Sequence, residues 1–273
     1  MNRFLIYSFI LCVSLCSCSH TDRLVRSNQT LSDQISTSSS QRTLKQFDRL
    51  EYPSIDKGED VAEHLGFTSS YNHQLLLPNW VAYELTAEET QGNSKGKESF
   101  SWDPKLSGRQ ANREDYKNDQ QWDKGHMAPK ADMKWSTQAY EESFYLSNIC
   151  PQNHTLNARD WLTLENLARR MATKYGKVYI ICGPIVTSNQ YGTLGESEIT
   201  IPDMFFKALL VPKNQSYSSI AFVMQNNPDH HDLSEYAMTV DSLERLINKD
   251  LFHFLNNKIE KIVESQLIFS DWV

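Results

Sequence analysis

The chain has 273 residues, of which 40% are hydrophobic and 22% are charged, a balance typical of a soluble globular protein that can bury a sizeable core. This composition argues against a chain that is disordered throughout, a collagen-like repeat and a polytopic membrane protein. The formal net charge of −7 argues mildly against a nucleic-acid-binding protein, because such proteins usually carry a basic surface, so the local charge has to decide.

The N-terminal segment is typical of an exported protein. Arg3 precedes an apolar run over residues 4–15, which is too short for the roughly 20 residues of a spanning helix but fits a secretory signal peptide. Leu-Cys-Ser-Cys at 15–18 resembles the cleavage motif of bacterial lipoproteins, which implies removal of residues 1–17 and a lipid anchor on Cys18. An ordinary cleaved signal is the alternative. We expect export, with the protein lipid-anchored in the periplasm or at the cell surface, or otherwise secreted.

A polar tract and one domain follow the signal segment. Residues 18–50 include a stretch rich in Ser, Thr, Gln and Asn, which has little to bury and predicts a flexible tether. Residues 51–273 are expected to form a single mixed domain. Only Cys150 and Cys182 lie beyond residue 18, which argues against a disulfide-built scaffold; whether they pair or stay as buried thiols is left open.

Hydrophobic patterns predict several strands and two helices in this domain. Apolar and aromatic residues predict strands over residues 80–85, 144–149, 178–182, 205–211 and 219–224. A helix is predicted over residues 157–175, with Gly176 as its stop. A later helix is predicted from Asp241, with Glu244 completing a capping box, through Phe254. The elements together predict a mixed α/β fold.

The first segment with chemical potential is residues 122–133, WDKGHMAPKADM. Gly125 permits a tight backbone before His126, and Pro129 prevents a continuing helix, so His126 is expected at a strand end or turn. Histidine titrates near neutral pH and can act as a general base. A lone histidine is more often structural, so the segment alone does not establish catalysis.

The second segment places polar residues in a row on the helix predicted over 157–175. Asn157, Trp161, Glu165 and Arg169 recur at intervals of four, beside the apolar face of that helix. The simple interpretation is a solvated face with a Glu165–Arg169 ion pair, worth about 0.3–0.5 kcal/mol. The functional interpretation is that Asn157 and Glu165 hold a hydrated hard cation while Arg169 faces an anion.

These segments together resemble the DNA/RNA non-specific endonuclease family, the endonuclease G-like branch of the ββα-metal (His-Me finger) nucleases. The matching residues are Asp123, Gly125-His126, Asn148, Gln152, Asn157, Trp161, Glu165 and Arg169, and similarity extends over roughly residues 70–255. The resemblance implies an α+β fold with a central, largely antiparallel sheet flanked by helices and a ββα-metal motif at the active site. It also implies a sugar-non-specific endonuclease acting on DNA and RNA and leaving 5′-phosphate ends.

The resemblance assigns roles residue by residue. His126 is similar to the general base, and Asn157 to the single protein ligand of a catalytic Mg²⁺, which Mn²⁺ can replace. Glu165 would hold a metal-bound water, and Arg169 would stabilise charge on the phosphate. Asn148 and Gln152 match positions that support the site. A homodimer is also compatible with the family.

The chain departs from the family pattern at two positions. Lys124 stands between Asp123 and Gly125 where the family usually has Arg, so the planar two-pronged geometry is lost although the charge is kept. The upstream arginine of the family is also absent, and Lys95 or Lys97 is the candidate replacement. The alternative function is therefore a catalytically impaired surface lipoprotein that only binds nucleic acid or a partner.

Local charge is compatible with a nuclease. Residues 95–134 hold nine Lys and Arg against seven Asp and Glu, and residues 157–177 hold five against two. Such cations can hold backbone phosphates without reading bases. Two other hypotheses have less support: a metal site in Asp229-His-His-Asp232, which fits an exposed turn better, and a cysteine hydrolase using Cys150, which has no activating helix start.

Overall fold

The computed structural model describes residues 49–117 and 119–272. The signal segment, Cys18 and nearly all of the tether expected from the sequence lie outside the described residues. Two residues at the start of the described part are buried. Leu50 belongs to a hydrophobic cluster that includes Trp80, and the ring centroid of Tyr52 lies 6.3 Å from that of Trp80. Within residues 49–117 and 119–272, no helix has both the length and the apolar character needed to cross a membrane.

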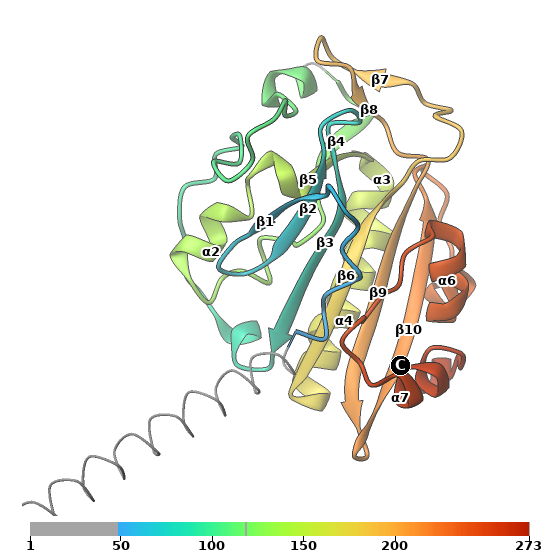
Figure 1. Ribbon diagram of the computed structural model, residues 1–273. Helices are drawn as coiled ribbons and strands as arrows, with labels where there is room; N and C mark the ends of the chain where they lie inside the picture. Colours follow the sequence, from blue (N-terminus) through green and yellow to red (C-terminus); the bar gives the residue numbers. More distant parts are fainter. Residues whose placement is uncertain (1–48, 118, 273) are drawn as a thin grey trace, which may run out of the picture. The chain divides into compact units, whose positions relative to one another are not determined.

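A seven-stranded antiparallel sheet organises residues 49–272 (Figure 1). Its strands, in spatial order, are β1 (Asp60–Glu63), β2 (Thr68–Asn72), β3 (Leu77–Thr86), β6 (Lys177–Ile185), β9 (Met204–Lys213), β10 (Ser216–Gln225) and β11 (Ala237–Met238). Every neighbouring pair is antiparallel. This confirms the mixed α/β fold with a largely antiparallel sheet, and four of the five predicted strands lie within β3, β6, β9 and β10.

Both faces of the sheet are buried, and each supports its own hydrophobic cluster. Alternation along β3 sends Trp80 and Ala82 into one cluster and Val81 and Tyr83 into the other. Helix α4 (Leu162–Tyr175) covers the face that holds Val81, while α6 (Val240–Ile247) and α7 (Asn257–Val263) cover the opposite face (Figure 1). The central strands are therefore nearly continuous apolar runs, as two-sided burial requires.

A separate two-stranded ribbon carries the first chemical segment. Strand β4 (Trp122–His126) pairs antiparallel with β5 (Ile149–Asn153), and His126 lies opposite Ile149. Helix α2 (Thr137–Glu142) lies between them in the chain, capped by Ser136. The strand predicted over 144–149 is wrong, because residues 146–148 form a 3-10 turn. The apolar residues Phe144, Leu146 and Ile149 are buried around this turn, so their presence reflects burial and not a strand.

The helix predicted over residues 157–175 is confirmed, with an irregular start. It begins as α3 (His154–Leu156), continues through a π-helical turn (Asn157–Trp161), and becomes α4 (Leu162–Tyr175). Gly176 ends it with φ of 86°, a conformation that side-chain-bearing residues avoid. A π-helical turn is rare and is frequently found at functional sites.

The later helix is shorter than predicted. Helix α6 ends at Ile247, because Asn248 adopts a left-handed conformation with φ of 52°. Thr239, and not Asp241, caps its start by accepting a hydrogen bond from Ser242 N. Leu251 lies beyond the helix, in a turn stabilised by a 2.7 Å bond from its backbone nitrogen to Glu244 Oε1. The smaller elements are β7 (Thr193–Leu194), β8 (Ile199–Thr200), α5 (Leu233–Tyr236) and 3-10 turns at Glu89–Gln91, Arg113–Tyr116 and Phe269–Asp271.

Candidate active site

His126 is the last residue of β4, and its ring is enclosed by aromatic side chains. The ring centroid lies 5.7 Å from that of Phe100 and 5.2 Å from that of Phe144. Nε2 is buried and has no hydrogen-bond partner among the described residues. Burial, reinforced by the positive charge of Lys130, lowers the pKa of His126 to about 4. The imidazole is therefore neutral at pH 7 and able to accept a proton.

Asn148 holds the backbone that follows His126. Its side chain is fully buried: Oδ1 accepts a 2.8 Å bond from Ala128 N, and Nδ2 donates to the carbonyl oxygens of Ala128 and Ser143, both at 2.8 Å. The backbone oxygen of Asn148 also accepts from Met127 N at 3.0 Å. Asn148 is thus a positioning residue for the His126 turn.

Gly125 is required for a different reason than the one expected from the sequence. Its φ is not positive, but a Cβ at this position would lie 2.3 Å from Gln152 Oε1 and 2.5 Å from Gln152 Cβ. Gln152 is fully buried, and neither atom of its amide group has a hydrogen-bond partner among the described residues. The glycine therefore leaves room for the glutamine of the partner strand instead of allowing a tight turn.

Asn157 is oriented by β4. Its Nδ2 donates a 2.8 Å hydrogen bond to Asp123 Oδ2, and the same carboxylate contacts His154 Nδ1 at 3.0 Å. One helical turn later, Trp161 Nε1 donates to the backbone oxygen of His126 at 3.3 Å. These bonds fasten the π-helical turn onto the strand that carries His126, so His126 and Asn157 belong to one rigid unit.

The donor set at Asn157 fits a hydrated hard cation. Because Nδ2 is used by Asp123, Oδ1 is the free atom of the amide, and no described residue forms a hydrogen bond to it. A neutral amide oxygen beside a carboxylate is the type of oxygen ligand that Mg²⁺ accepts while it keeps most of its waters. The residues present therefore fit the metal that the sequence leads us to expect.

Two lysines supply positive charge near His126. The Lys124 amine lies 4.8 Å from the Tyr116 ring centroid and 5.5 Å from that of Phe100, and burial lowers its pKa. Lys130 lies 2.9 Å from Glu98 Oε1 and packs over Phe144. Sequence reasoning assigned no role to Lys130, although it lies four residues after His126 in the same segment.

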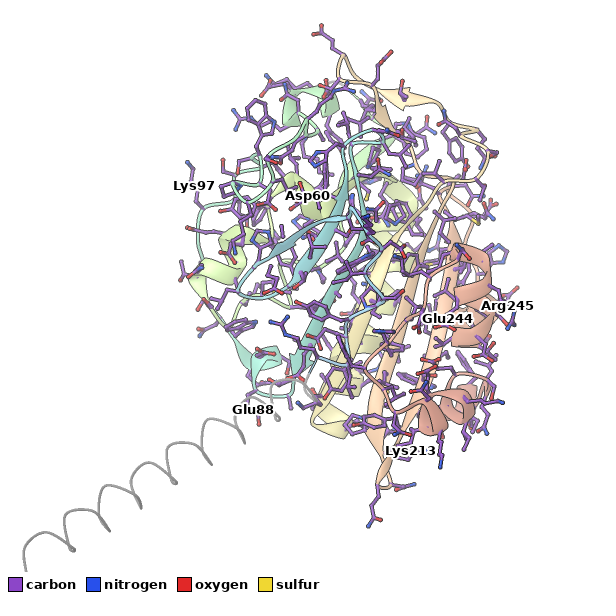
Figure 2. All side chains as sticks on the ribbon, in the orientation of Figure 1. Asp60, Glu88, Lys97, Lys213, Glu244 and Arg245 are labelled. Atoms are coloured by element: carbon purple, nitrogen blue, oxygen red, sulfur yellow. The ribbon has the colours of Figure 1, made fainter. Side chains whose placement is uncertain are left out.

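Lys95 and Lys97 have no side-chain contact with His126. Figure 2 shows Lys97 at the periphery of the molecule, with its side chain pointing outward. Arg113 instead borders a cavity of about 420 Å³ next to Phe100, which is also lined by Trp102. Trp102 is 65% exposed, an unusual degree for a tryptophan. Sequence reasoning missed both residues, since neither belongs to a local motif.

Glu165 and Arg169 lie further along the helix and form a buried ionic cluster with Asp132, and the charge of the buried Lys207 acts on both carboxylates. Arg169 contacts Asp132 Oδ1 at 2.5 Å and Glu165 Oε2 at 3.8 Å. Glu165 is 8% exposed, and its burial raises its pKa to about 7. The polar row predicted along this helix is therefore not a solvated face. Trp161 and Glu165, at and just after the π-helical turn, are both buried in the interior.

Lys207 connects this cluster to the His126 turn. It is fully buried in β9, its amine donates to Met127 O at 3.3 Å, and it lies 4.5 Å from the Trp161 ring centroid. A lysine inside the apolar run of β9 is the sequence signal that could have revealed it, since lysine is almost never fully buried unless it is paired.

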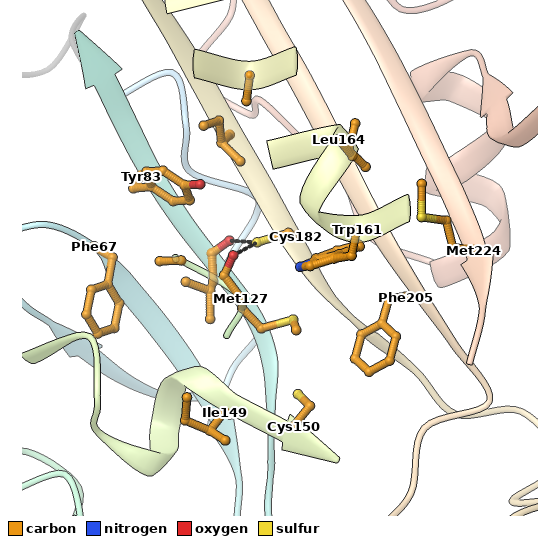
Figure 3. Close-up of a cluster of buried hydrophobic side chains, with 14 of the residues drawn as sticks. Phe67, Tyr83, Met127, Ile149, Cys150, Trp161, Leu164, Cys182, Phe205 and Met224 are labelled. Carbon is orange, nitrogen blue, oxygen red and sulfur yellow. Dashed lines mark hydrogen bonds between the residues drawn. The ribbon is translucent and has the colours of Figure 1, made fainter. Parts of the chain in front are cut away.

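The two cysteines of the domain are free and buried. Figure 3 shows the Cys182 thiol hydrogen-bonded to two carbonyl oxygens, those of Met127 at 3.3 Å and Val81 at 3.6 Å. Burial raises the pKa of the Cys150 thiol well above its ordinary value, which opposes formation of a nucleophilic thiolate. The geometry therefore speaks against a cysteine hydrolase.

Residues 226–236 clamp the start of the helix. The buried Asn226 accepts a 2.7 Å bond from Asn153 N through Oδ1 and donates to the carbonyl oxygens of Pro151 and Pro202 at 3.1 and 2.9 Å. His230 Nδ1 and Tyr236 OH contact the carboxylate of Asp160 at 2.5 and 2.6 Å. The Asp229–Asp232 turn thus holds the π-helical turn in place.

A basic groove borders the exposed side of α4. A cavity of about 630 Å³ is lined by Thr90, Gln91, Asn166, Arg169, Arg170, Thr173 and Lys174. Three of these residues are cations and the others are polar. Such a surface suits an anionic polymer, in agreement with the local excess of positive charge in this segment.

Comparison with known proteins supports the family resemblance that the sequence motifs indicated. A family model described as DNA/RNA non-specific endonuclease matches residues 45–260. The mitochondrial nuclease EXOG of Danio rerio is 33% identical over 206 residues, which cover 70% of this chain and 60% of that protein. The Xenopus laevis protein of the same name is 32% identical, with 69% and 57% covered. The chain therefore spans 57–60% of the length of these two relatives.

A solved structure shows the same architecture. The crystal structure of the EndoG/EndoGI complex, described as showing the mechanism of EndoG inhibition, contains a chain that aligns with a TM-score of 0.70 and 25% sequence identity. The alignment covers 79% of this chain and 94% of that one. Human mitochondrial endonuclease G is 29% identical over 180 residues, with 61% of this chain and 60% of that protein covered.

Proposed function

We propose that this chain, which belongs to the DNA/RNA non-specific endonuclease family, is a metal-dependent endonuclease that hydrolyses phosphodiester bonds of DNA and RNA and leaves 5′-phosphate ends. The observation that carries the proposal is the attachment of the Asn157 turn to the His126 strand through Asp123 and Trp161. This attachment keeps a proton acceptor and a metal-ligating oxygen in one fixed arrangement.

In this proposal His126 is the general base. Its neutral imidazole takes a proton from the water that attacks phosphorus, and the unpartnered ring nitrogen is compatible with that task. Phe100 and Phe144 pack against the ring and restrict its rotation. Asn148 fixes the following backbone, so the ring keeps its direction during turnover.

Asn157 is the proposed metal ligand, and Asp123 keeps its Oδ1 turned outward. Mg²⁺, for which Mn²⁺ can substitute, would neutralise charge on the phosphate and the leaving 3′-oxygen when bound there. Lys124 adds positive charge on the His126 side of the strand. From the cluster with Asp132, Glu165 would accept hydrogen bonds from water near the metal, and Arg169 would stabilise negative charge on the phosphate.

The surfaces around the site suit a substrate that is bound through its backbone. The groove beside Arg169 carries three cations, which hold phosphates without reading sequence. The exposed Trp102 ring next to Phe100 offers a surface on which a base can stack, whatever its identity. This combination supports activity on both DNA and RNA. No contact among the described residues favours the binding-only alternative.

Cleavage of supercoiled plasmid and of single-stranded RNA tests the proposal. The full chain is assayed with Mg²⁺ and with EDTA, beside His126→Ala and Asn157→Ala. Chelator-sensitive cutting of both substrates that is lost in both variants is the expected result. A well-folded protein that cuts neither substrate with Mg²⁺ or Mn²⁺ would overturn the proposal. Glu196→Gln, a change at an exposed carboxylate, is the control and should cut normally.

We propose further that the protein is exported and anchored through Cys18, on the basis of its N-terminal segment. Incorporation of labelled palmitate by bacteria that express the chain tests this proposal. Cys18→Ser should abolish the label and move nuclease activity out of the membrane fraction, whereas the control Cys16→Ser should keep it. A homodimer remains a proposal that sedimentation of the purified protein can test.

A further inference from the structure

Three carboxylates meet on the face of the sheet opposite to α4. Asp241 and Glu244 lie one turn apart on α6, and Glu264 follows the last residue of α7. One oxygen from each of these three residues lies within 4.8 Å of the other two. A 3.2 Å backbone bond from Asp241 N to Glu264 O fixes the two segments relative to each other.

Glu264 is buried without a partner. It is 2% exposed, and its Oε1 forms no hydrogen bond with any described residue. A buried carboxylate oxygen without a hydrogen bond is costly, because it has lost its water and gained nothing in return. Its position at the acidic cluster indicates that something outside the chain satisfies it.

The charges around Glu264 are negative and favour a positively charged partner. Asp250 and Glu260 add to the negative potential, and within residues 49–117 and 119–272 no Lys, Arg or His forms an ion pair with Asp241, Glu244 or Glu264. Burial together with these carboxylates raises the pKa of Glu264 to about 9 and that of Glu244 to about 7. The three carboxylates therefore lie together without a positive partner among the described residues.

We infer that Asp241, Glu244 and Glu264 form a calcium-binding site, separate from the site at Asn157. Ca²⁺ binds oxygen ligands at about 2.3–2.6 Å, so three carboxylate oxygens within 4.8 Å of one another can close on one ion through small side-chain rotations. Mg²⁺ requires a tighter octahedron and gives up its waters reluctantly, so it fits this set of carboxylates less well. Figure 2 shows Glu244 on the inner side of α6, while Arg245 projects outward from the same helix.

The consequence of this site is stability of the C-terminal segment. Glu244 also accepts the bond from Leu251 N, and the carbonyl of Val263 accepts from Ser219 in β10 at 3.0 Å. A bound ion would therefore join α6, the turn after it and the end of α7 to the sheet. Because the ion would bind the folded chain only, the unfolding temperature must rise with its concentration.

Thermal unfolding of the full chain after EDTA treatment and dialysis tests this inference. We expect 2 mM CaCl₂ to raise the Tm by about 5 °C, and equimolar MgCl₂ to raise it less. The calcium-dependent rise should persist in Asn157→Ala, which removes the proposed catalytic ligand, and in the control Glu196→Gln. The calcium-dependent rise in Tm should be lost in Glu264→Gln and in Asp241→Asn. Asp241 is only half-buried, so Asp241→Asn provides the test if Glu264→Gln does not fold.

Two results would overturn the inference. One is an unchanged Tm of the unmodified chain in CaCl₂, with no heat of binding by calorimetry. The other is a calcium-dependent rise that remains in Asp241→Asn or Glu264→Gln, since the ion would then bind elsewhere. Because the readout is stability, failure of this inference is distinguishable from failure of the proposed nuclease activity.

Discussion

The side-chain nitrogen of Asn157 donates a 2.8 Å hydrogen bond to the carboxylate of Asp123, a residue 34 positions earlier in the chain. This bond settles which end of the amide faces outward. Without it, the amide could turn by half a rotation and present nitrogen, which does not bind metal ions, at the proposed metal position. Asp123 thus acts on the proposed metal through Asn157.

Asp123→Ala is expected to weaken activation by Mg²⁺. Loss of a residue that orients a metal ligand typically lowers metal affinity or activity by about 10- to 100-fold, and we expect a loss of about this size here. The concentration of Mg²⁺ for half-maximal plasmid cleavage should rise, while the folded fraction stays high because Asp123 is partly exposed. Glu196→Gln, at an exposed carboxylate outside the site, is the control. An unchanged Mg²⁺ requirement in Asp123→Ala would contradict the orienting role.

The lowered pKa of His126 predicts two pH dependences. Activity that needs the neutral imidazole should rise with pH through about 4 and show no loss from this group at neutral pH. Stability should also rise with pH between about 4 and the ordinary value of 6.5, because in that window the unfolded chain binds a proton that the folded chain does not. The full effect is on the order of 3 kcal/mol.

Denaturant unfolding of the unmodified chain and of His126→Gln at several pH values measures this effect. The difference in unfolding free energy between the two proteins should change steadily from pH 6.5 to 4. Other titrating groups cancel in this difference, provided that they lie far from the substitution. A constant difference across this range would show that His126 is not shielded from water as described.

Gly125→Ala should destabilise the chain and disturb the site. The added methyl group would overlap Gln152, which is buried and has nowhere to move, at a cost of about 1–3 kcal/mol. Gln152→Gly removes the whole overlapping side chain, its Cβ included, so the double variant should be more stable than the sum of the single losses predicts. Unfolding in urea measures the coupling. Additive effects would mean that the two side chains do not compete for space.

Lys207→Met should leave an excess of buried negative charge. Asp132 and Glu165 would then face Arg169 alone, and removal of one partner from a buried ionic cluster costs about 3–5 kcal/mol. Adding Glu165→Gln restores neutrality and should recover part of the loss in the unfolding free energy. Lys57→Met, at an exposed lysine, should be nearly silent. Equal destabilisation in the single and double variants would contradict the charge argument.

Residues within one segment could be predicted well from the sequence. His126 ends a strand, as predicted from residues close to it in the chain such as Pro129. The helix over residues 157–175 was predicted for the same reason, since its apolar period and Gly176 are local signals. The mixed fold with a largely antiparallel sheet is confirmed, as is the family.

Features that depend on distant partners could not be predicted. Gly125 and Gln152 meet only because β4 and β5 pair in one register, which no local pattern specifies. Lys207 reaches Met127 across 80 residues of sequence. The helix beginning near Asp241 was extended too far because Leu251 and Phe254 continue an apolar pattern, although Asn248 turns the backbone away. Trp102 and Arg113 form part of a cavity only after the loops around Phe100 fold.

The bonds made by Asn226 bear on the order in which the chain matures during synthesis. This residue joins β5, the segment around Pro202 and the end of β10 through three hydrogen bonds. A nascent chain that has emerged only as far as β9 already contains both motifs but lacks the side chain that anchors Asn153 and the start of the helix. Contacts between residues so distant in sequence form late in folding. The proposed catalytic arrangement is therefore completed only after β10 has been made, and an unfinished chain is expected to lack the proposed nuclease activity.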